Sequence, residues 1–158
     1  MKYKYFINNE CKDNCDGYYK LEIDDQTLIL KYTQCFDSIN DVLKAGAEIK
    51  AYDIKNKLCW DDIPDGYYVN NKQIGTDGTN WKYEIVKECE FFYFLDKNTN
   101  DGNKEYHQCI VSCTSNGLDL YYIQGQKNCE IDCTKFKKNY YNKNNHECLD
   151  TCKGLPNY

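Results

Sequence analysis

The cysteines are the residues of this chain most able to do chemistry. A cysteine can bind zinc as a thiolate, attack a substrate as a nucleophile, or form a disulfide bond. The chain has 11 cysteines in 158 residues. Four pairs of them share the spacing C-x3-C, namely Cys11/Cys15, Cys109/Cys113, Cys129/Cys133 and Cys148/Cys152.

The three other cysteines fit the same spacing if the fourth residue after each is included. Cys35 is followed by Ile39, Cys59 by Ile63, and Cys89 by Tyr93. All the cysteines then lie in seven C-x3-[C/I/Y] nodes, which start 24, 24, 30, 20, 20 and 19 residues apart. A period of this length predicts a tandem repeat.

Each span between nodes has the composition of a β-hairpin. Turn-forming residues stand at the midpoints, around residues 25, 76 and 101, between runs rich in aromatic and branched side chains. A hairpin would bring the second cysteine of one node next to the first cysteine of the following node. This geometry predicts the disulfides Cys15–Cys35, Cys113–Cys129 and Cys133–Cys148.

Five cysteines have no partner by this rule. Cys11 and Cys152 are expected to pair with units outside this chain. Cys59, Cys89 and Cys109 follow nodes that lack a second cysteine, and we favour Cys59–Cys89 among them. The sequence leaves the pairing of these five open, because spacing alone does not determine connectivity.

Zinc binding is the main alternative use of the cysteines. His107-x-Cys109-x3-Cys113 and His146-x-Cys148-x3-Cys152 have the same spacing and three zinc-ligand types each. Structural zinc sites favour C-x2-C, however, and the first cysteines at 129 and 11 have Lys127 and Asn9 in place of the histidine. We therefore expect both histidines to lie in exposed hairpin tails, and we predict no metal site.

Catalysis and cofactor binding are not expected. The chain has only two histidines to serve as the base for a thiol nucleophile. The pairs Asp24-Asp25 and Asp61-Asp62 lie next to turns and are expected to be solvated. The sequence contains no phosphate-binding glycine loop, no dinucleotide motif and no nucleophile elbow. We predict a protein that is not an enzyme and holds no cofactor.

The composition excludes several other classes of protein. Leu, Ile, Val and Phe make up only 32 of the residues, which is the level at which a chain struggles to bury a core. The net charge is −5 and no residue is arginine, so a nucleic-acid partner is not expected. No apolar run approaches the length of a membrane span. Residues 1–10 also lack the apolar stretch of a secretory signal, so an extracellular protein would need one outside this chain.

The units Cys133-TKFKKNYYNKNNHE-Cys148-LDT-Cys152 and Cys11-KDN-Cys15-DGYY resemble the cysteine-rich repeats of protozoan surface proteins. Those repeats are similar in turn to the furin-like repeats of growth-factor-receptor ectodomains, in which one disulfide often closes one short β-loop. The resemblance covers Cys109 to Cys152 and Cys11 to Cys35. It implies an extracellular rod of linked disulfides, in a family whose members serve as antigens, adhesins or receptor stalks.

The predicted fold is small, disulfide-rich and mainly β, an elongated tandem array of short hairpins. We divide it into N-terminal units at 1–35, degenerate units with longer hairpins at 36–108, and regular units at 109–158. Asp37 or Asn40 could cap a short helix within 37–50, although Gly46 weakens it.

The middle segment has lost cysteines and needs another source of stability. We expect one compact apolar cluster there, with Ile39, Ile63 and Tyr93 packed where other units have cysteines. Its other members would be Val42, Leu43, Ile49, Ile54, Leu58, Trp60, Trp81, Ile85 and Phe92. Trp60 and Trp81 are also the candidate contact residues for a partner.

The predicted function is that of a non-catalytic extracellular segment of a surface or secreted protein, acting as spacer, antigenic coat or adhesion module. Its partner would be a protein or a cell surface. One alternative is an intracellular zinc-binding Cys/His protein. Another is a small secreted effector or inhibitor.

Overall fold

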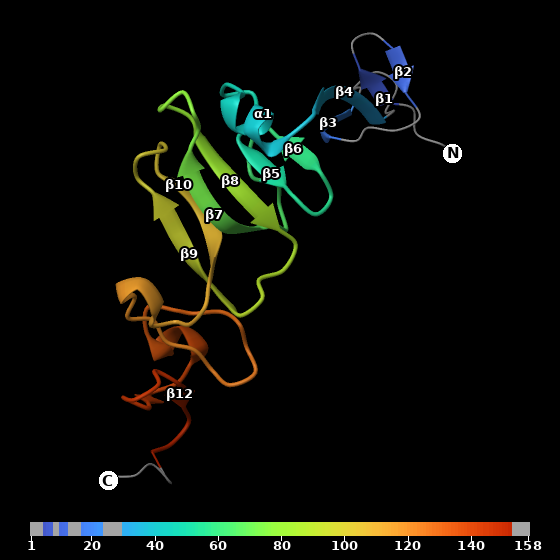
Figure 1. Ribbon diagram of the computed structural model, residues 1–158. Helices are drawn as coiled ribbons and strands as arrows, with labels where there is room; N and C mark the ends of the chain where they lie inside the picture. Colours follow the sequence, from blue (N-terminus) through green and yellow to red (C-terminus); the bar gives the residue numbers. More distant parts are fainter. Residues whose placement is uncertain (1–4, 8–9, 13–16, 24–29, 153–158) are drawn as a thin grey trace. The chain divides into compact units, whose positions relative to one another are not determined.

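The chain folds into two compact units (Figure 1). The computed structural model describes the backbone of residues 5–7, 10–12, 17–23 and 30–152, and the side chains of 17–20 and 36–152. Unit 1 comprises residues 1–67 and 71–86, and unit 2 comprises residues 68–70 and 87–158. The three predicted segments divide the chain by sequence repeats instead of compactness, and they stay a prediction.

Unit 1 is built from β-hairpins that share a mixed sheet. Strands β1 (Tyr5–Ile7) and β2 (Glu10–Lys12) pair with each other alone. The larger sheet has the order β4-β3-β6-β5-β8-β7 in this unit. Its strands are β3 (Tyr18–Ile23), β4 (Leu30–Phe36), β5 (Ala51–Asp53), β6 (Leu58–Trp60), β7 (Tyr68–Ile74, of which the first three residues belong to unit 2) and β8 (Trp81–Val86).

Neighbouring hairpins in this sheet are joined by parallel pairing. Strands β3 and β4 are antiparallel, as are β5 and β6. The two hairpins meet through parallel pairs of Tyr19 with Leu58 and Lys20 with Cys59, and β5 meets β8 in the same way. The prediction of a mainly β, cysteine-rich fold with hairpins is confirmed, but these parallel contacts were not expected. The elongated tandem array stays a prediction.

The one α-helix of the described residues is short and has a defined start. Helix α1 (Ile39–Lys44) falls within the predicted range 37–50. Its cap is Ser38, because the Ser38 backbone N–H and hydroxyl both donate to Oδ2 of Asp41, at 3.2 and 2.8 Å. Neither Asp37 nor Asn40 is the cap, so that detail of the prediction was wrong.

Unit 1 has an apolar core under this helix. The buried cluster contains Val42, Ile49, Tyr52, Cys59 and Tyr18, with Phe36, Ile39, Leu43 and Ala45 packed against it. The compact cluster expected in the middle segment is thus confirmed in part, and Ile85 is also fully buried. Ile54 is 48 % exposed, however, because it begins the turn after β5 instead of facing the helix. Leu58, Trp60, Ile63 and Trp81 are only half-buried, and Phe92 belongs to the other unit.

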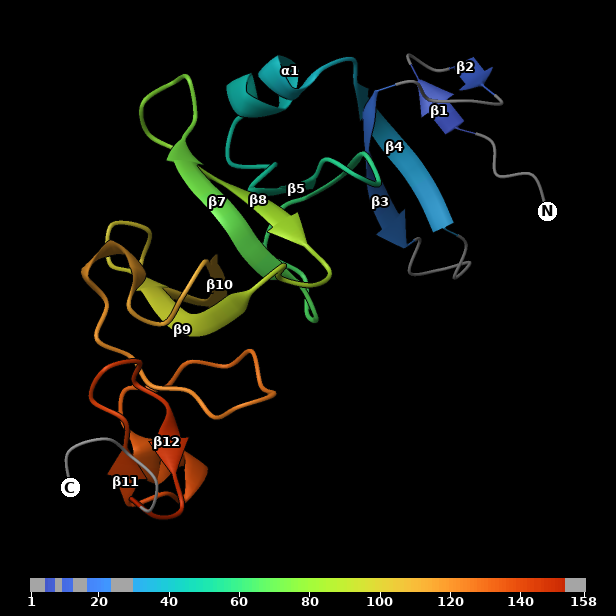
Figure 2. The same ribbon diagram turned by 60° about the horizontal axis from the view of Figure 1, so that its bottom comes forward.

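Unit 2 begins with a long hairpin and continues with short irregular loops (Figure 2). Strands β9 (Phe92–Asn98) and β10 (Lys104–Ile110) are antiparallel, and their turn contains the predicted Asp101-Gly102. The first residues of β7 join this hairpin through the parallel pair of Val69 with Gln108. After it come two 3₁₀ helices and a two-stranded ladder, namely η1 (Ser115–Gly117), η2 (Cys133–Phe136), β11 (Tyr140–Tyr141) and β12 (Cys148–Leu149).

Three disulfides hold unit 2 together. Cys113 bonds Cys129 and Cys133 bonds Cys148, which confirms both pairs predicted here. The third disulfide is Cys89–Cys109, so the favoured Cys59–Cys89 pair was wrong.

The error has a physical reason. Cys59 lies in β6, fully buried in the core of unit 1, whereas Cys89 follows β8 and belongs to unit 2. The predicted Cys15–Cys35 pair lies outside the side chains that the structure describes.

Within the described part of the chain, no helix has the length and apolar character needed to cross a bilayer.

Candidate functional site

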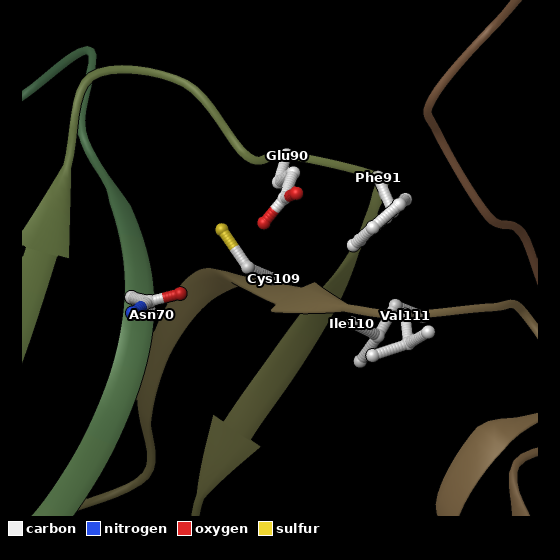
Figure 3. Close-up of a pocket in the computed structure, with 6 residues that line it drawn as sticks. All are labelled: Asn70, Glu90, Phe91, Cys109, Ile110 and Val111. Atoms are coloured by element: carbon white, nitrogen blue, oxygen red, sulfur yellow. The ribbon is translucent and has the colours of Figure 1, made fainter.

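A hollow in unit 2 lies beside the Cys89–Cys109 disulfide (Figure 3). Its volume is about 210 Å³. It is lined by Asn70, Glu90, Phe91, Cys109, Ile110 and Val111. Figure 3 shows Glu90 and Phe91 on the segment that leads into β9, and Cys109 to Val111 where β10 ends. Phe91 is 49 % exposed and Val111 is 68 % exposed, so the apolar part of its rim is open to solvent, beside the polar Asn70 and Glu90.

An ion pair fixes the segment that carries this rim. Nζ of Lys127 lies 2.7 Å from Oε1 of Glu88 and donates at 2.7 Å to the backbone oxygen of Cys89. The hydrogen bond and the positive charge of Lys127 lower the pKa of Glu88. Because both side chains are well exposed, solvent screens the ion pair and it stabilises the loop after β8 only weakly, while the bond to the Cys89 oxygen adds a second link. The hollow therefore presents apolar side chains next to polar groups, and this combination is suited to binding a partner.

Other exposed apolar side chains extend this character over unit 2. Leu95 is 62 % exposed and Ile131 is 67 % exposed, and Tyr140 and Tyr141 are 46 % and 48 % exposed. A thin, disulfide-linked unit cannot bury all its apolar side chains, so single exposures are ordinary. The hollow is the candidate binding region, because Phe91 and Val111 line it together.

The two histidine-cysteine motifs are not arranged as zinc sites. Cys109, Cys113 and Cys148 are all bonded in disulfides, so their sulfurs are not thiolates. The ring of His107 packs against Tyr68 and Tyr93, with centroids 5.9 and 5.4 Å away.

The second histidine packs in the same manner. The ring of His146 stacks on Tyr121 at 4.9 Å, and its Nδ1 lies 3.2 Å from Oδ1 of Asp119. His146 is half-buried by these contacts, which differs from the exposed tail that the sequence predicts. Both histidine rings therefore lie against tyrosines, His146 stacked on Tyr121 and His107 at an angle to Tyr68 and Tyr93.

Cys59 is a free thiol with no access to solvent. Its side chain is fully buried in the core of unit 1. Burial raises the pKa of this thiol to about 12, against a smaller lowering effect of the Lys82 charge. A buried, protonated thiol is inert as a nucleophile and packs as a small apolar group.

The predicted contact residues Trp60 and Trp81 both lie in unit 1. Trp60 ends β6 and packs on Tyr67, with ring centroids 5.1 Å apart, and Trp81 begins β8. Both side chains are half-buried. Their role as partner contacts stays a prediction.

Neither Phe91 nor Val111 is among the contact residues predicted from the sequence. Phe91 lies in an aromatic run that follows Cys89, and Val111 lies between Cys109 and Cys113. The apolar character of Val111, between the two cysteines of its node, was the signal in the sequence that could have indicated this site.

Comparison with known protein families, with curated proteins and with solved structures finds no match to this chain.

Proposed function

We propose that the chain is a non-catalytic, extracellular cysteine-rich segment of a surface or secreted protein and that it acts as an interaction module. The observation that carries this proposal is the interior of unit 2. Its buried side chains are mostly cysteines joined in disulfides, namely Cys89, Cys113, Cys129, Cys133 and Cys148. Such a unit depends on an oxidising compartment for its stability, and three intrachain disulfides fit an extracellular or secreted protein.

The surface of the same unit favours interaction over a purely spacing role. Disulfides replace apolar side chains in the interior, so Phe91, Leu95, Val111 and Ile131 are left at the surface. Protein interfaces are enriched in aromatic side chains at their centres. The resemblance to the cysteine-rich repeats of protozoan surface proteins supports the same proposal, and the antigenic-coat and adhesion roles belong to it.

The test measures two properties, the location of the protein in cells and the redox state of its cysteines. Antibody labelling of intact and permeabilised cells that produce the protein should give equal signals if it lies at the surface. Peptide mapping of the native protein without reduction should recover the three disulfides of unit 2. Labelling that needs permeabilisation, together with fully alkylated cysteines and stoichiometric zinc, would refute the proposal and favour an intracellular zinc protein.

A further inference from the structure

A backbone contact between neighbouring hairpins recurs at three tyrosines. The N–H of Tyr93 donates to the backbone oxygen of Lys127 at 2.9 Å, and the N–H of Cys129 donates to the oxygen of Tyr93 at 2.8 Å. At Tyr93, Tyr122 and Tyr19 alike, one backbone edge of the tyrosine pairs with an extended segment that runs parallel to it and leads to a cysteine.

The other two instances have the same register. The N–H of Tyr122 donates to the oxygen of His146 at 3.2 Å, and the N–H of Cys148 donates to the oxygen of Tyr122 at 2.7 Å. The N–H of Tyr19 donates to the oxygen of Lys57 at 3.0 Å, two residues before Cys59. The incoming oxygen always belongs to the second residue before a cysteine that starts a node.

The same kind of tyrosine edge exists in β11 but is not occupied. Tyr140 pairs with Leu149 and Tyr141 with Cys148, as Tyr93 pairs with Cys109. The N–H of Asn142 donates to the oxygen of Glu147, so by the alternation of antiparallel bonds the N–H and C=O of Tyr141 point away from β12. No residue in the described part of the chain pairs with these two groups.

The Tyr140 side chain beside this edge is 46 % exposed. Tyr141 is 48 % exposed, and its ring meets the ring of Tyr121 with centroids 5.0 Å apart. At the occupied edge of Tyr122, the incoming segment also places the ring of His146 on Tyr121, where it stacks at 4.9 Å. Tyr140 takes the place of Tyr121 in β11, so its ring is available for the same contact.

We infer that the outer edge of β11 at Tyr141 binds an extended segment that ends in a cysteine, supplied by another cysteine-rich unit of this kind, and that this cysteine then bonds Cys152. The inference goes beyond the proposed function because it assigns a surface and a class of partner. It rests on continuity with the three edges already filled. An unpaired strand edge is a ready template for such an addition.

The inferred disulfide between the incoming cysteine and Cys152 follows the pattern of disulfides in unit 2. The cysteine that reaches the edge of Tyr93 is Cys129, which is bonded to Cys113. The cysteine that reaches the edge of Tyr122 is Cys148, which is bonded to Cys133. Each partner is the second cysteine of the preceding node, and for the edge of Tyr141 that residue is Cys152. Cys152 has no disulfide and is partly exposed.

The covalent step is a thiol–disulfide exchange. The thiolate of Cys152 attacks the incoming cysteine while that sulfur is held in a mixed disulfide. The new S–S bond forms, the old one breaks, and the second thiol of the mixed disulfide leaves as a thiolate. No separate oxidant is needed, because the mixed disulfide takes up the two electrons.

The test uses the whole chain and a peptide with the sequence of residues 142–149, the segment that fills the edge of Tyr122. Its cysteine carries thionitrobenzoate as a mixed disulfide, and mass mapping identifies the cysteine of the protein that captures the peptide. A matched peptide is N-methylated at the cysteine amide, which removes the donor to the oxygen of Tyr141. We expect capture at Cys152 to be about tenfold faster for the unmethylated peptide, because one backbone hydrogen bond is lost in the control.

Variants of Tyr141 separate the backbone edge from the ring. Tyr141→Pro removes the outward N–H without removing a bond to β12, and Tyr141→Ala removes the ring but keeps that N–H. Capture should fall more in Tyr141→Pro than in Tyr141→Ala, and Cys152→Ser should abolish it. Equal rates for the two peptides with the unmodified protein would overturn the inference, whatever the variants do. A dimer linked from Cys152 to Cys152 in place of peptide capture would also overturn it.

Discussion

Removal of one disulfide from unit 2 should loosen that unit and leave unit 1 intact. The change is the double substitution Cys133→Ala with Cys148→Ala, which opens a loop with a sequence separation of 15. Closing a loop of this length stabilises a folded chain by about 3 kcal/mol on the chain-entropy model. That is a large part of the stability of a small domain, and the interior of unit 2 offers few other buried apolar groups to compensate.

Hydrogen exchange followed by mass spectrometry measures this effect in each unit separately. A loss of about 3 kcal/mol corresponds to roughly a hundredfold faster exchange for amides that open with the loop. The affected amides should include those of Tyr122 and Cys148, whose hydrogen bonds join the end of this loop to the preceding hairpin. The amides of β5 and β8 in unit 1 should keep their protection.

Cys152→Ser is the matched control, because it removes a cysteine of the same unit that has no disulfide. It should leave exchange in both units unchanged. If the double variant exchanges like the wild-type protein, the disulfide does not hold unit 2 together. If amides in unit 1 lose as much protection as those in unit 2, the two units are not separately stabilised, and the prediction that the effect is confined to unit 2 is refuted.

Three further predictions concern unit 1. The difference in free energy of unfolding between the wild-type protein and Cys59→Ala should be constant below pH 9.0 and should decrease between pH 9.0 and about 12. The reason is that the thiol of the unfolded chain loses its proton in this range, whereas the buried thiol, with its raised pKa, keeps it. Urea unfolding should give a slope of about 1.4 kcal/mol per pH unit, and a difference that does not change with pH would contradict the prediction. Ser38→Ala removes the cap of α1 and should cost about 1 kcal/mol in the same assay, whereas no loss would mean that the bonds to Asp41 do not stabilise the helix. Ile39→Cys should create a disulfide with Cys59, since Ile39 stands at the second position of its node and packs against the cluster that contains Cys59; non-reducing peptide mapping would detect it, and two free thiols in the native variant would refute it.

The sequence predicted what is local in the fold. The pairs Cys113–Cys129 and Cys133–Cys148 close short loops, so a turn within each span brings both sulfurs to the base of one loop. The turn at Asp101-Gly102 was found for the same reason, because its backbone needs a positive φ at Gly102, which is +59°. Such features depend on a few neighbouring residues and leave a clear pattern.

The contacts between hairpins could not be predicted in this way. The parallel bridge between Tyr93 and Asn128 joins residues 35 positions apart through backbone atoms only. Backbone groups are the same in every residue, so such a bridge puts little constraint on side-chain type. Tyr52 faces Cys59 and Tyr141 faces Cys148, and in the sequence six residues separate the tyrosine from the cysteine in both pairs. This spacing does not show what lies on the opposite edge of the tyrosine strand.

The candidate site was missed for a related reason. Trp60 and Trp81 were predicted as partner contacts because they are large and lie in the longer units. Those units have a core of their own, and both tryptophans are half-buried. Phe91 and Val111 are exposed instead, since the disulfide-rich unit 2 has no comparable core to take them in.

The backbone bridge and the disulfide are separable features of these hairpins, and unit 1 shows which one is more general. Cys59 has no disulfide, yet the segment before it still occupies the edge of Tyr19, with the Lys57 oxygen at 3.0 Å. The thiol there is buried and packs as an apolar group, so the loss of its bond partner leaves no reactive cysteine behind. Edge pairing therefore brings the hairpins together, and the disulfide reinforces a contact that already exists. For the same reason the open edge of Tyr141 is the primary feature of the inferred binding surface, and Cys152 serves to make the contact permanent.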